Sequence, residues 1–253
     1  MSYLPLLKHL ADEADRIATH YFRSNRLKVS RKENTTPVSV ADLEIEKVIR
    51  DYVQEHHPEL GILGEEYEAV PSTTGSRLII DPIDGTQNFI TNVPFFACLL
   101  AVETNGKVVS GLISAPMLHE RWWAESGKGA FANGHAVHVS DTKELSQSQI
   151  NYGSLFGVET EPEHQESVIK LLSQSRRQRG YGDFYSHLLV GCGSADISIE
   201  YNVHPWDMAP IKIFVEEAGG RFTDFKGEDT IYSGNFIVSN GHLHSQALAA
   251  WDK

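Results

Sequence analysis

The spacing of apolar residues changes twice along the chain, and this change limits the folds that it can adopt. Apolar residues recur at helical intervals over residues 4–21 and again over residues 39–56. Short apolar runs bounded by turn residues follow from residue 61, and two of them flank Asn105-Gly106, a common hairpin turn. Beyond residue 148, strand-like and helix-like segments alternate. We therefore expect helices, an antiparallel sheet and then an α/β layer.

The chain of 253 residues is long enough for one large domain or two closely packed halves. We place the division between residues 1–143 and 144–253, in a stretch of mostly polar residues from 141 to 148. The first half is expected to be α+β with the antiparallel sheet, and the second half α/β. Together they should form one compact catalytic unit.

Composition excludes several classes of partner. The formal net charge of −12 argues against nucleic acid, which would require a basic surface. It does not argue against a small phosphate ester, because bound cations can reverse the local field. No apolar stretch reaches the length of a membrane span, and the first residues lack the pattern of a secretory signal. We therefore expect a cytoplasmic protein with no membrane partner.

The segment Asp81-Pro82-Ile83-Asp84 directly follows the apolar run at residues 78–80. Because proline favours extended backbone in the residue before it, we expect Asp81 at the end of a strand and Asp84 one turn further on. Two carboxylates this close repel each other unless a proton or a cation lies between them. With the carbonyl of Ile83 they would give the all-oxygen ligand set that Mg²⁺ prefers.

Gly85 and Thr86 complete this segment and suggest a phosphate contact. Glycine lets the backbone approach a ligand closely, and successive amides at a turn that enters a helix can bind an anion. The hydroxyl of Thr86 could orient a water molecule. The alternative is an ordinary Asp-Gly turn, but the complete six-residue string after an apolar strand is far rarer than that turn.

Three other acidic residues are candidates for the same site. Glu65 follows a strand-like run. The alternative is that Glu65 and its neighbour Glu66 are two adjacent acidic residues at a solvated edge with no role in binding. Asp207 stands where a helix is expected to begin, and Asp42 follows Ser39 at the spacing of a capping box, so each of them could instead be a helix cap. Acidic groups at several strand ends and helix starts predict one shared cation site.

Taken together, these motifs resemble the inositol monophosphatase superfamily of Mg²⁺-dependent phosphatases, and most of all its histidinol-phosphate phosphatase branch. The resemblance spans nearly the whole chain. The matching segments are Gly64-Glu65-Glu66, residues 81–86, Trp206-Asp207-Met208-Ala209-Pro210, residues 36–42 with Glu46 beyond them, residues 127–134 and residues 216–220.

This resemblance implies a layered α-β-α-β-α sandwich that forms a homodimer and binds two or three Mg²⁺ ions. Glu65, Asp81 and the carbonyl of Ile83 would hold one ion. Asp81, Asp84 and Asp207 would hold a second, and a third, weaker ion could lie near Glu65. It further implies that a metal-activated water attacks a small phosphate monoester.

Thr86 would position the attacking water, with Asp42 or Glu65 behind it, and Gly85 and Thr86 would contact the phosphate. No motif for a covalent nucleophile is evident, so the scheme needs no phosphoenzyme.

The substrate implied by the branch is L-histidinol phosphate, which would be hydrolysed to L-histidinol and phosphate in histidine biosynthesis. The segment around Arg179 and Asp183 carries this part of the resemblance. Asp183 and Glu200 would contact the cationic part of the substrate, and Arg179 lies nearby in sequence. The alternative for either acid is a structural ion pair, for instance with Arg179. Inositol 1-phosphate or a related sugar phosphate is the alternative substrate, and a non-catalytic metal-binding protein is a more distant alternative.

Overall fold

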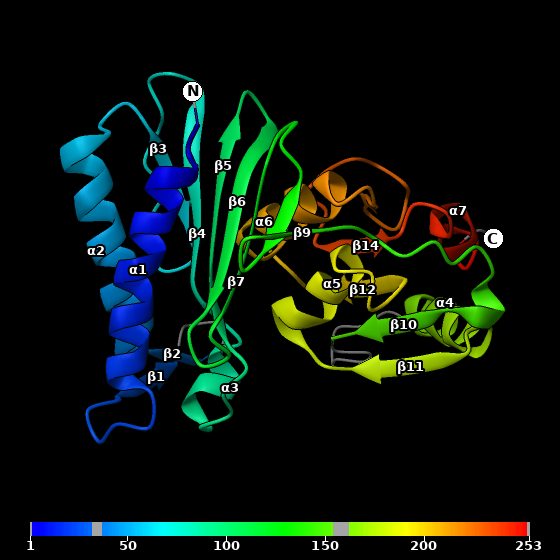
Figure 1. Cartoon of the computed structure of the whole chain (residues 1–253). Coiled ribbons are helices and arrows are strands. Elements are labelled where there is room, and N and C mark those ends of the chain that lie inside the picture. The colour runs from blue at the N-terminus through cyan, green and yellow to red at the C-terminus, as the bar shows by residue number, and fades with distance from the viewer. Residues whose placement is uncertain (1, 32–36, 154–161, 252–253) are drawn as a thin grey trace.

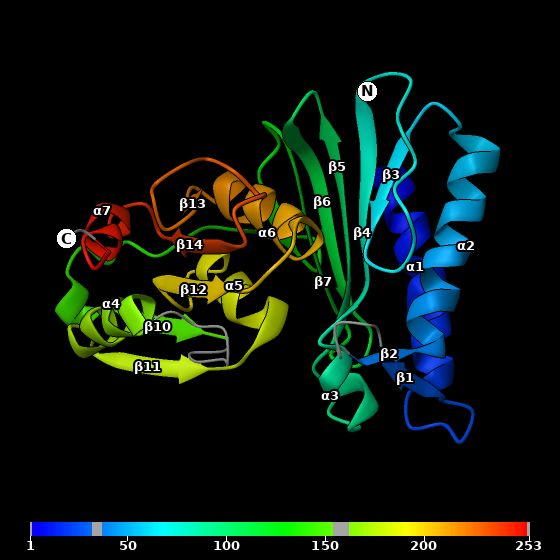
Figure 2. The same cartoon turned by 180° about the vertical axis from the view of Figure 1, so that it is seen from behind.

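Helices and sheets alternate in five layers in the computed structural model of the chain (Figures 1 and 2). The structure describes residues 2–31, 37–153 and 162–251. Thr36, the first residue of a segment that resembled the family, lies outside them. The layers are a helix pair, a seven-stranded sheet, a central helix pair, a five-stranded sheet and an outer helix pair, so the expected α-β-α-β-α sandwich is confirmed.

The seven-stranded sheet is antiparallel except at one edge, where its first two strands run parallel. Asn105-Gly106 forms the tight turn between two central strands, as the sequence predicts. In spatial order the strands are β3 (Gly61–Gly64), β4 (Ser76–Asp84), β5 (Ala97–Thr104), β6 (Lys107–Ala115), β7 (Glu120–Glu125), β8 (Ala130–Ala132) and β9 (His135–Val137).

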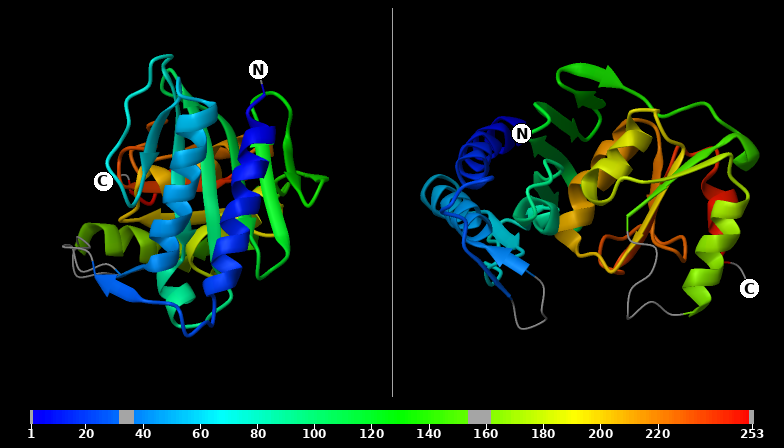
Figure 3. Two further views of the ribbon diagram at one scale, coloured as in Figure 1. Left: turned by 90° about the vertical axis from the view of Figure 1, so that its left-hand side faces the viewer. Right: turned by 90° about the horizontal axis from the view of Figure 1, so that it is seen from below.

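Two amphipathic helices, α1 (Leu4–Tyr21) and α2 (Val40–His56), cover the outer face of this sheet (Figure 3). Their apolar residues are buried against alternate residues of β4 and β5, which point to the same side. The side chain of Ser39 caps the first turn of α2, as the spacing to Asp42 predicts. A short ribbon of β1 (Val29–Arg31) and β2 (Pro37–Ser39) connects the two helices.

The five-stranded sheet is mixed, and its parallel strands end at one edge. β10 (Gln149–Tyr152) runs parallel to both β11 (Arg177–Gly180) and β12 (Ile197–Tyr201). The other two strands, β14 (Asn235–Ser239) and β13 (Arg221–Thr223), complete the sheet in antiparallel pairings. Helices α4 (Pro162–Ser173) and α7 (His244–Leu248) cover its outer face.

Helices α5 (Asp183–Gly191) and α6 (Pro205–Glu217) lie between the two sheets (Figure 3). One apolar cluster joins them to both sheets, with Trp122 from the first sheet and Phe236 from the second. A 3₁₀ turn, η1 (Leu145–Gln147), leads into the second sheet close to the predicted division at residue 143. The division into halves stays a prediction, because the core is shared across it.

The segment that carries the first acidic pair differs from the expectation in one respect. We expected the strand to end at Asp81, but β4 continues through Asp84. The pairing with β5 shifts between these two residues, since Asp81 lies opposite Leu99 and Asp84 lies opposite Ala97. This bulge accommodates Pro82, which cannot donate a ladder hydrogen bond, within the strand.

Candidate active site

Three carboxylates converge where the first sheet meets the central helices. Asp81 and Asp84 come from the bulged end of β4, and Asp207 comes from the first turn of α6. Each offers a carboxylate oxygen, and these oxygens lie within 4.8 Å of one another. The fold therefore brings together, from two distant segments, three side chains that the sequence predicts at one site, and their role as metal ligands stays a prediction.

The electrostatics of this cluster favour a cation. Burial, followed by the charges of neighbouring carboxylates, raises the pKa values of Asp81 and Asp84 well above their ordinary range. Burial likewise raises the pKa of Asp207 to about 6. One oxygen of Asp81, Oδ1, is buried without a hydrogen-bond partner. A hard cation with oxygen ligands would satisfy this atom and offset the repulsion, so the residues fit a divalent metal.

Glu65 reaches the same cluster through the parallel pairing of β3 with β4. The backbone N–H of Glu65 donates to the carbonyl of Ile80 at 3.2 Å, which places Glu65 beside Asp81. The charge of Glu65 contributes to the raised pKa values of Asp81 and Asp207. Glu65 therefore lies where the sequence predicts it, at the edge of the carboxylate cluster.

A buried ion pair that the motifs did not reveal supports the backbone around Glu65. Glu46 of α2 accepts from Arg50 Nε at 2.7 Å and from the backbone N–H of Glu66 at 2.8 Å. A Cβ atom on Gly64 would lie only 2.0 Å from Glu46 Oε1, so only glycine fits at that position. The sequence had shown Glu46 and Gly64 only as parts of family motifs.

Asp42 caps a helix and also contacts Thr86, while its catalytic role stays a prediction. Its Oδ2 accepts from the backbone N–H of Ser39 at 2.9 Å and from the Ser39 hydroxyl at 2.6 Å, which completes the capping box. Its Oδ1 lies 3.3 Å from the hydroxyl oxygen of Thr86. Burial raises the pKa of Asp42 to about 6 against the effect of the Ser39 hydrogen bonds. One oxygen thus caps a helix while the other faces the candidate site.

Thr86 and Gly85 lie at the turn from β4 into the short helix α3 (Thr86–Ile90). The Thr86 hydroxyl donates to the carbonyl of Ile83 at 2.9 Å. Gly85 has a φ of 80°, and a Cβ atom there would lie 2.9 Å from the carbonyl oxygen of Phe95. The glycine is needed for both reasons.

Asp183 lies beside this turn rather than in an ion pair. Its Oδ2 accepts from Asn88 Nδ2 at 2.7 Å, and its charge helps to raise the pKa of Asp84. Burial raises the pKa of Asp183 itself. Arg179, on β11, is exposed and donates to the carbonyl of Gln178 at 2.7 Å. Among the described residues Arg179 forms no ion pair, so the structural alternative for Asp183 that we considered is not found.

Glu200 lies at the carboxyl end of β12, and its side chain is buried. Its charge contributes to the raised pKa of Asp84, which places Glu200 near the cluster. Glu200 Oε2 lies 3.7 Å from Nε2 of His187, and burial lowers the pKa of this histidine to about 3. His187 is therefore neutral at physiological pH. Neither His187 nor Asn88 was predicted, because no local motif marks them.

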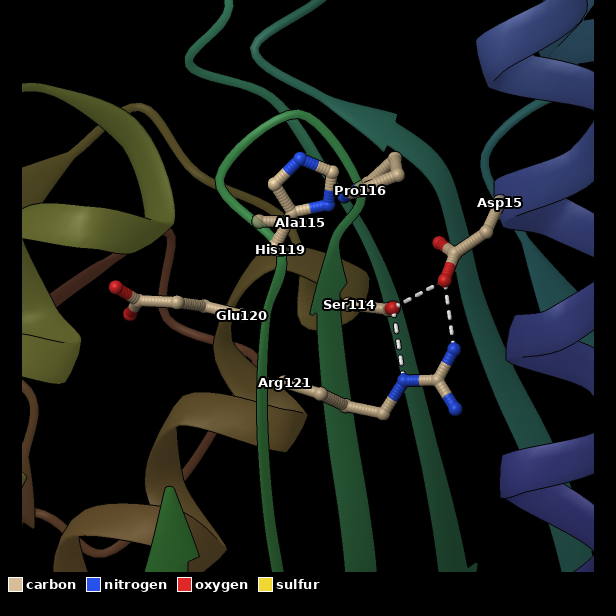
Figure 4. A pocket seen from close by; sticks show the side chains of 7 residues that line it. All are labelled: Asp15, Ser114, Ala115, Pro116, His119, Glu120 and Arg121. Atoms are coloured by element: carbon tan, nitrogen blue, oxygen red, sulfur yellow. Dashed lines mark hydrogen bonds and ion pairs between the residues drawn. The ribbon is translucent and has the colours of Figure 1, made fainter. Parts of the chain in front are cut away.

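A separate pocket lies away from these residues, between α1 and the hairpin of β6 and β7 (Figure 4). Its volume is about 320 Å³. Its polar groups bind one another: Arg121 donates to Asp15 at 2.6 Å and to Ser114 Oγ at 3.0 Å. Burial raises the pKa of Asp15. None of the predicted site residues lines this pocket. The hydrogen bonds among Asp15, Ser114 and Arg121 connect α1 to the sheet.

None of the helices within residues 2–31, 37–153 and 162–251 is both long enough and apolar enough to span a membrane.

Comparisons with known proteins agree with the sequence motifs. The chain is 39% identical over 250 residues to the histidinol-phosphatase of Mycobacterium tuberculosis, covering 97% of this chain and 96% of that protein. It is 40% identical over 254 residues to the histidinol-phosphatase of Streptomyces coelicolor, covering 97% and 95%.

Among solved structures, the extragenic suppressor protein suhB of Bartonella henselae superposes with a TM-score of 0.92 at 31% identity, covering 100% of this chain and 99% of that chain. The Thermotoga maritima IMPase superposes with a TM-score of 0.86 at 32% identity, covering 99% and 97%. The sequence also matches the family described as the inositol monophosphatase family over residues 3–253. The chain therefore belongs to the inositol monophosphatase family.

Proposed function

We propose that the chain is an Mg²⁺-dependent phosphatase that hydrolyses L-histidinol phosphate to L-histidinol and phosphate. The convergence of Asp81, Asp84 and Asp207 within 4.8 Å carries the proposal for the reaction type. The named histidinol-phosphatases at 39% and 40% identity support the substrate. Glu65, the three aspartates and the carbonyl of Ile83 would hold two or three Mg²⁺ ions.

The protein's own groups would prepare the attacking water. When bound, Mg²⁺ would neutralise charge on the phosphate oxygens and favour attack by water. The hydroxyl of Thr86, held between Asp42 and the carbonyl of Ile83, would orient that water. Asp42, whose pKa is raised to about 6, would accept a proton through Thr86 near neutral pH, with Glu65 as the alternative acceptor.

Carboxylates next to the cluster would select the substrate. L-Histidinol phosphate carries a primary ammonium and an imidazole, and buried carboxylates bind such cationic groups by charge-assisted hydrogen bonds. Asp183 and Glu200 are both positioned to influence Asp84 electrostatically. The backbone at Gly85 and Thr86 would contact the phosphate, and Arg179 stays a predicted substrate contact on the exposed strand β11.

The substrate proposal is tested by measuring phosphate release from L-histidinol phosphate and from inositol 1-phosphate side by side, with Mg²⁺. We expect kcat/KM to favour L-histidinol phosphate by at least about a hundredfold, because a polyol offers Asp183 and Glu200 no cationic group for a charge-assisted hydrogen bond. A preference for inositol 1-phosphate would contradict the substrate but leave the metal site intact. Absence of turnover with either ester or with a generic aryl phosphate would contradict the reaction itself.

Replacing Asp183 with alanine should raise the KM for L-histidinol phosphate by roughly tenfold. A charge-assisted hydrogen bond contributes about 1.5–3 kcal/mol, and about 1.4 kcal/mol corresponds to a factor of ten. The KM for a neutral aryl phosphate should change much less. Asp183→Asn serves as the matched control, since it removes the charge but keeps an acceptor for Asn88. Equal KM increases for both substrates would mean that Asp183 has only a structural role.

Two further proposals concern the state and the place in which the enzyme works. We propose that it is a homodimer and that it acts in the cytoplasm, where small-molecule biosynthesis supplies its substrate. The family resemblance supports both proposals, and a molar mass measured by light scattering would test the first.

A further inference from the structure

The carboxyl ends of three parallel strands bring a glycine and a glutamate together at the substrate end of the site. Tyr152 of β10 lies opposite Gly180 of β11 and Ile199 of β12. Gly153 directly follows β10, and Glu200 follows Ile199 on β12. Ligands of open α/β sheets bind beyond this edge of the strands, where the first turn of α5 also begins.

The carboxylate of Glu200 occupies the space that a side chain on Gly153 would need. A Cβ atom on Gly153 would lie 1.5 Å from Glu200 Oε2, 2.3 Å from Cδ and 2.5 Å from Oε1. No backbone atom is among these three nearest neighbours, and the φ of Gly153 is not in the left-handed region. An alanine at position 153 would therefore move the carboxylate of Glu200 rather than the chain.

His187 bounds the same carboxylate from α5. Its Nδ1 lies 2.9 Å from the hydroxyl oxygen of Ser198, and its ring contacts Phe236 edge to face at 4.6 Å between centroids. Phe236 is also the partner of Glu200 across β12 and β14. If Ser198 donates to Nδ1, the ring proton lies on Nε2, which faces Glu200 Oε2 at 3.7 Å.

We propose that Gly153 and His187 are positioning residues that fix the carboxylate of Glu200 for contact with the cationic part of the substrate. This inference rests on the proposed function of Glu200. Gly153 supplies the space that the carboxylate occupies, and the buried ring of His187 lies with its Nε2 atom 3.7 Å from the same oxygen, Oε2. Both act on the substrate only through Glu200.

A double-mutant cycle tests the glycine. Gly153→Ala should raise the KM for L-histidinol phosphate at least tenfold and the KM for a neutral aryl phosphate much less, since small displacements of a binding group have large effects. In a Glu200→Ala background the same change should alter either KM less than twofold. Gly180→Ala is the matched control, because the three atoms nearest to a Cβ there belong to the ring of Tyr152 and not to Glu200. A full effect of Gly153→Ala in the Glu200→Ala background would overturn the proposal.

The histidine is tested by rescue. His187→Ala should shift the ratio of the two KM values in the same direction as Gly153→Ala. His187→Gln, which can restore an N–H donor, should return the ratio at least halfway to that of the unmodified chain. If the ratio of the two KM values is the same in His187→Gln as in His187→Ala, the role of His187 is overturned.

A readout without substrate separates this proposal from the proposed function. Gly153→Ala should lower the Tm by about 2–4 °C, and by less than half of that in the Glu200→Ala background. If this coupling in Tm appears while Glu200→Ala leaves every KM unchanged, then Glu200 does not contact the substrate and the proposed substrate recognition fails. If the coupling is absent, the contact between Gly153 and Glu200 is wrong whatever the substrate.

Discussion

Replacing Asp84 with asparagine is expected to lower kcat by about a thousandfold while the protein stays folded. The substitution removes one of the three charges that converge at the cluster, and a loss of about 4 kcal/mol in transition-state stabilisation corresponds to this factor. Asp84 also accepts from the backbone N–H of Phe184 at 2.8 Å. An asparagine oxygen can still accept that hydrogen bond, so the first turn of α5 should remain in place. Phosphate release under saturating substrate and Mg²⁺ measures the effect.

Thermal unfolding gives this variant a second signature. In Mg²⁺-free buffer Asp84→Asn should be more stable than the unmodified chain, because repulsion with Asp207 and Asp183 is relieved. Addition of Mg²⁺ should then raise its Tm far less than it raises that of the unmodified chain. Asp51→Asn, an exposed residue of α2 outside the site, is the control and should change neither quantity. Activity within a factor of ten of the original would refute the role of Asp84.

The free energy of unfolding without Mg²⁺ is expected to fall as the pH rises from about 4 to about 6. Burial raises the pKa values of Asp42 and Asp207 from 3.8 to about 6 in the folded protein. The folded state therefore holds these protons more tightly than the unfolded state, and their stabilising effect is complete below pH 3.8 and lost as the pH passes 6. Asp42, which is fully buried, alone would account for about 3 kcal/mol.

Mg²⁺ should reverse this trend, because it binds the deprotonated carboxylates. The gain in the free energy of unfolding on adding Mg²⁺ should be small near pH 5 and large near pH 8, where it should reach about 2.7 kcal/mol at a hundredfold excess over Kd. Asp15 also has a raised pKa but lies in the separate pocket, so its share of the pH dependence should persist with Mg²⁺. Unfolding curves across this pH range with EDTA or Mg²⁺ provide the measurement. A Mg²⁺ effect that does not grow with pH would contradict a site made of these carboxylates.

The sequence predicted the acidic cluster because its members stand in short, unusual segments whose local structure is strongly restricted. Pro82 and Gly85 restrict the backbone on either side of Asp84, and Asp207 lies in the first turn of a helix. The spacing of apolar residues predicted the helices and the antiparallel sheet of the first half in the same way, whereas the five layers came from the family resemblance. These features depend on neighbours within a few residues, so the sequence alone was informative about them.

Contacts between distant segments could not be predicted in this way. The bulge in β4 depends on how that strand pairs with β5, and the hydrogen bond from Asn88 to Asp183 joins α3 to α5. Similarly, the neutral state of His187 follows from its burial between a helix and a sheet. None of these has a local signal, because each arises only when two parts of the core pack together.

The origin of the cluster in two elements gives any bound cation a mechanical effect. Asp81 and Asp84 belong to the first sheet, whereas Asp207 belongs to a helix of the central layer. A cation held by all three would act as a reversible cross-link between these layers. Transient separation of α6 from β4 would then require release of the cation. The concentration of free cation would therefore set how often the middle of the sandwich opens.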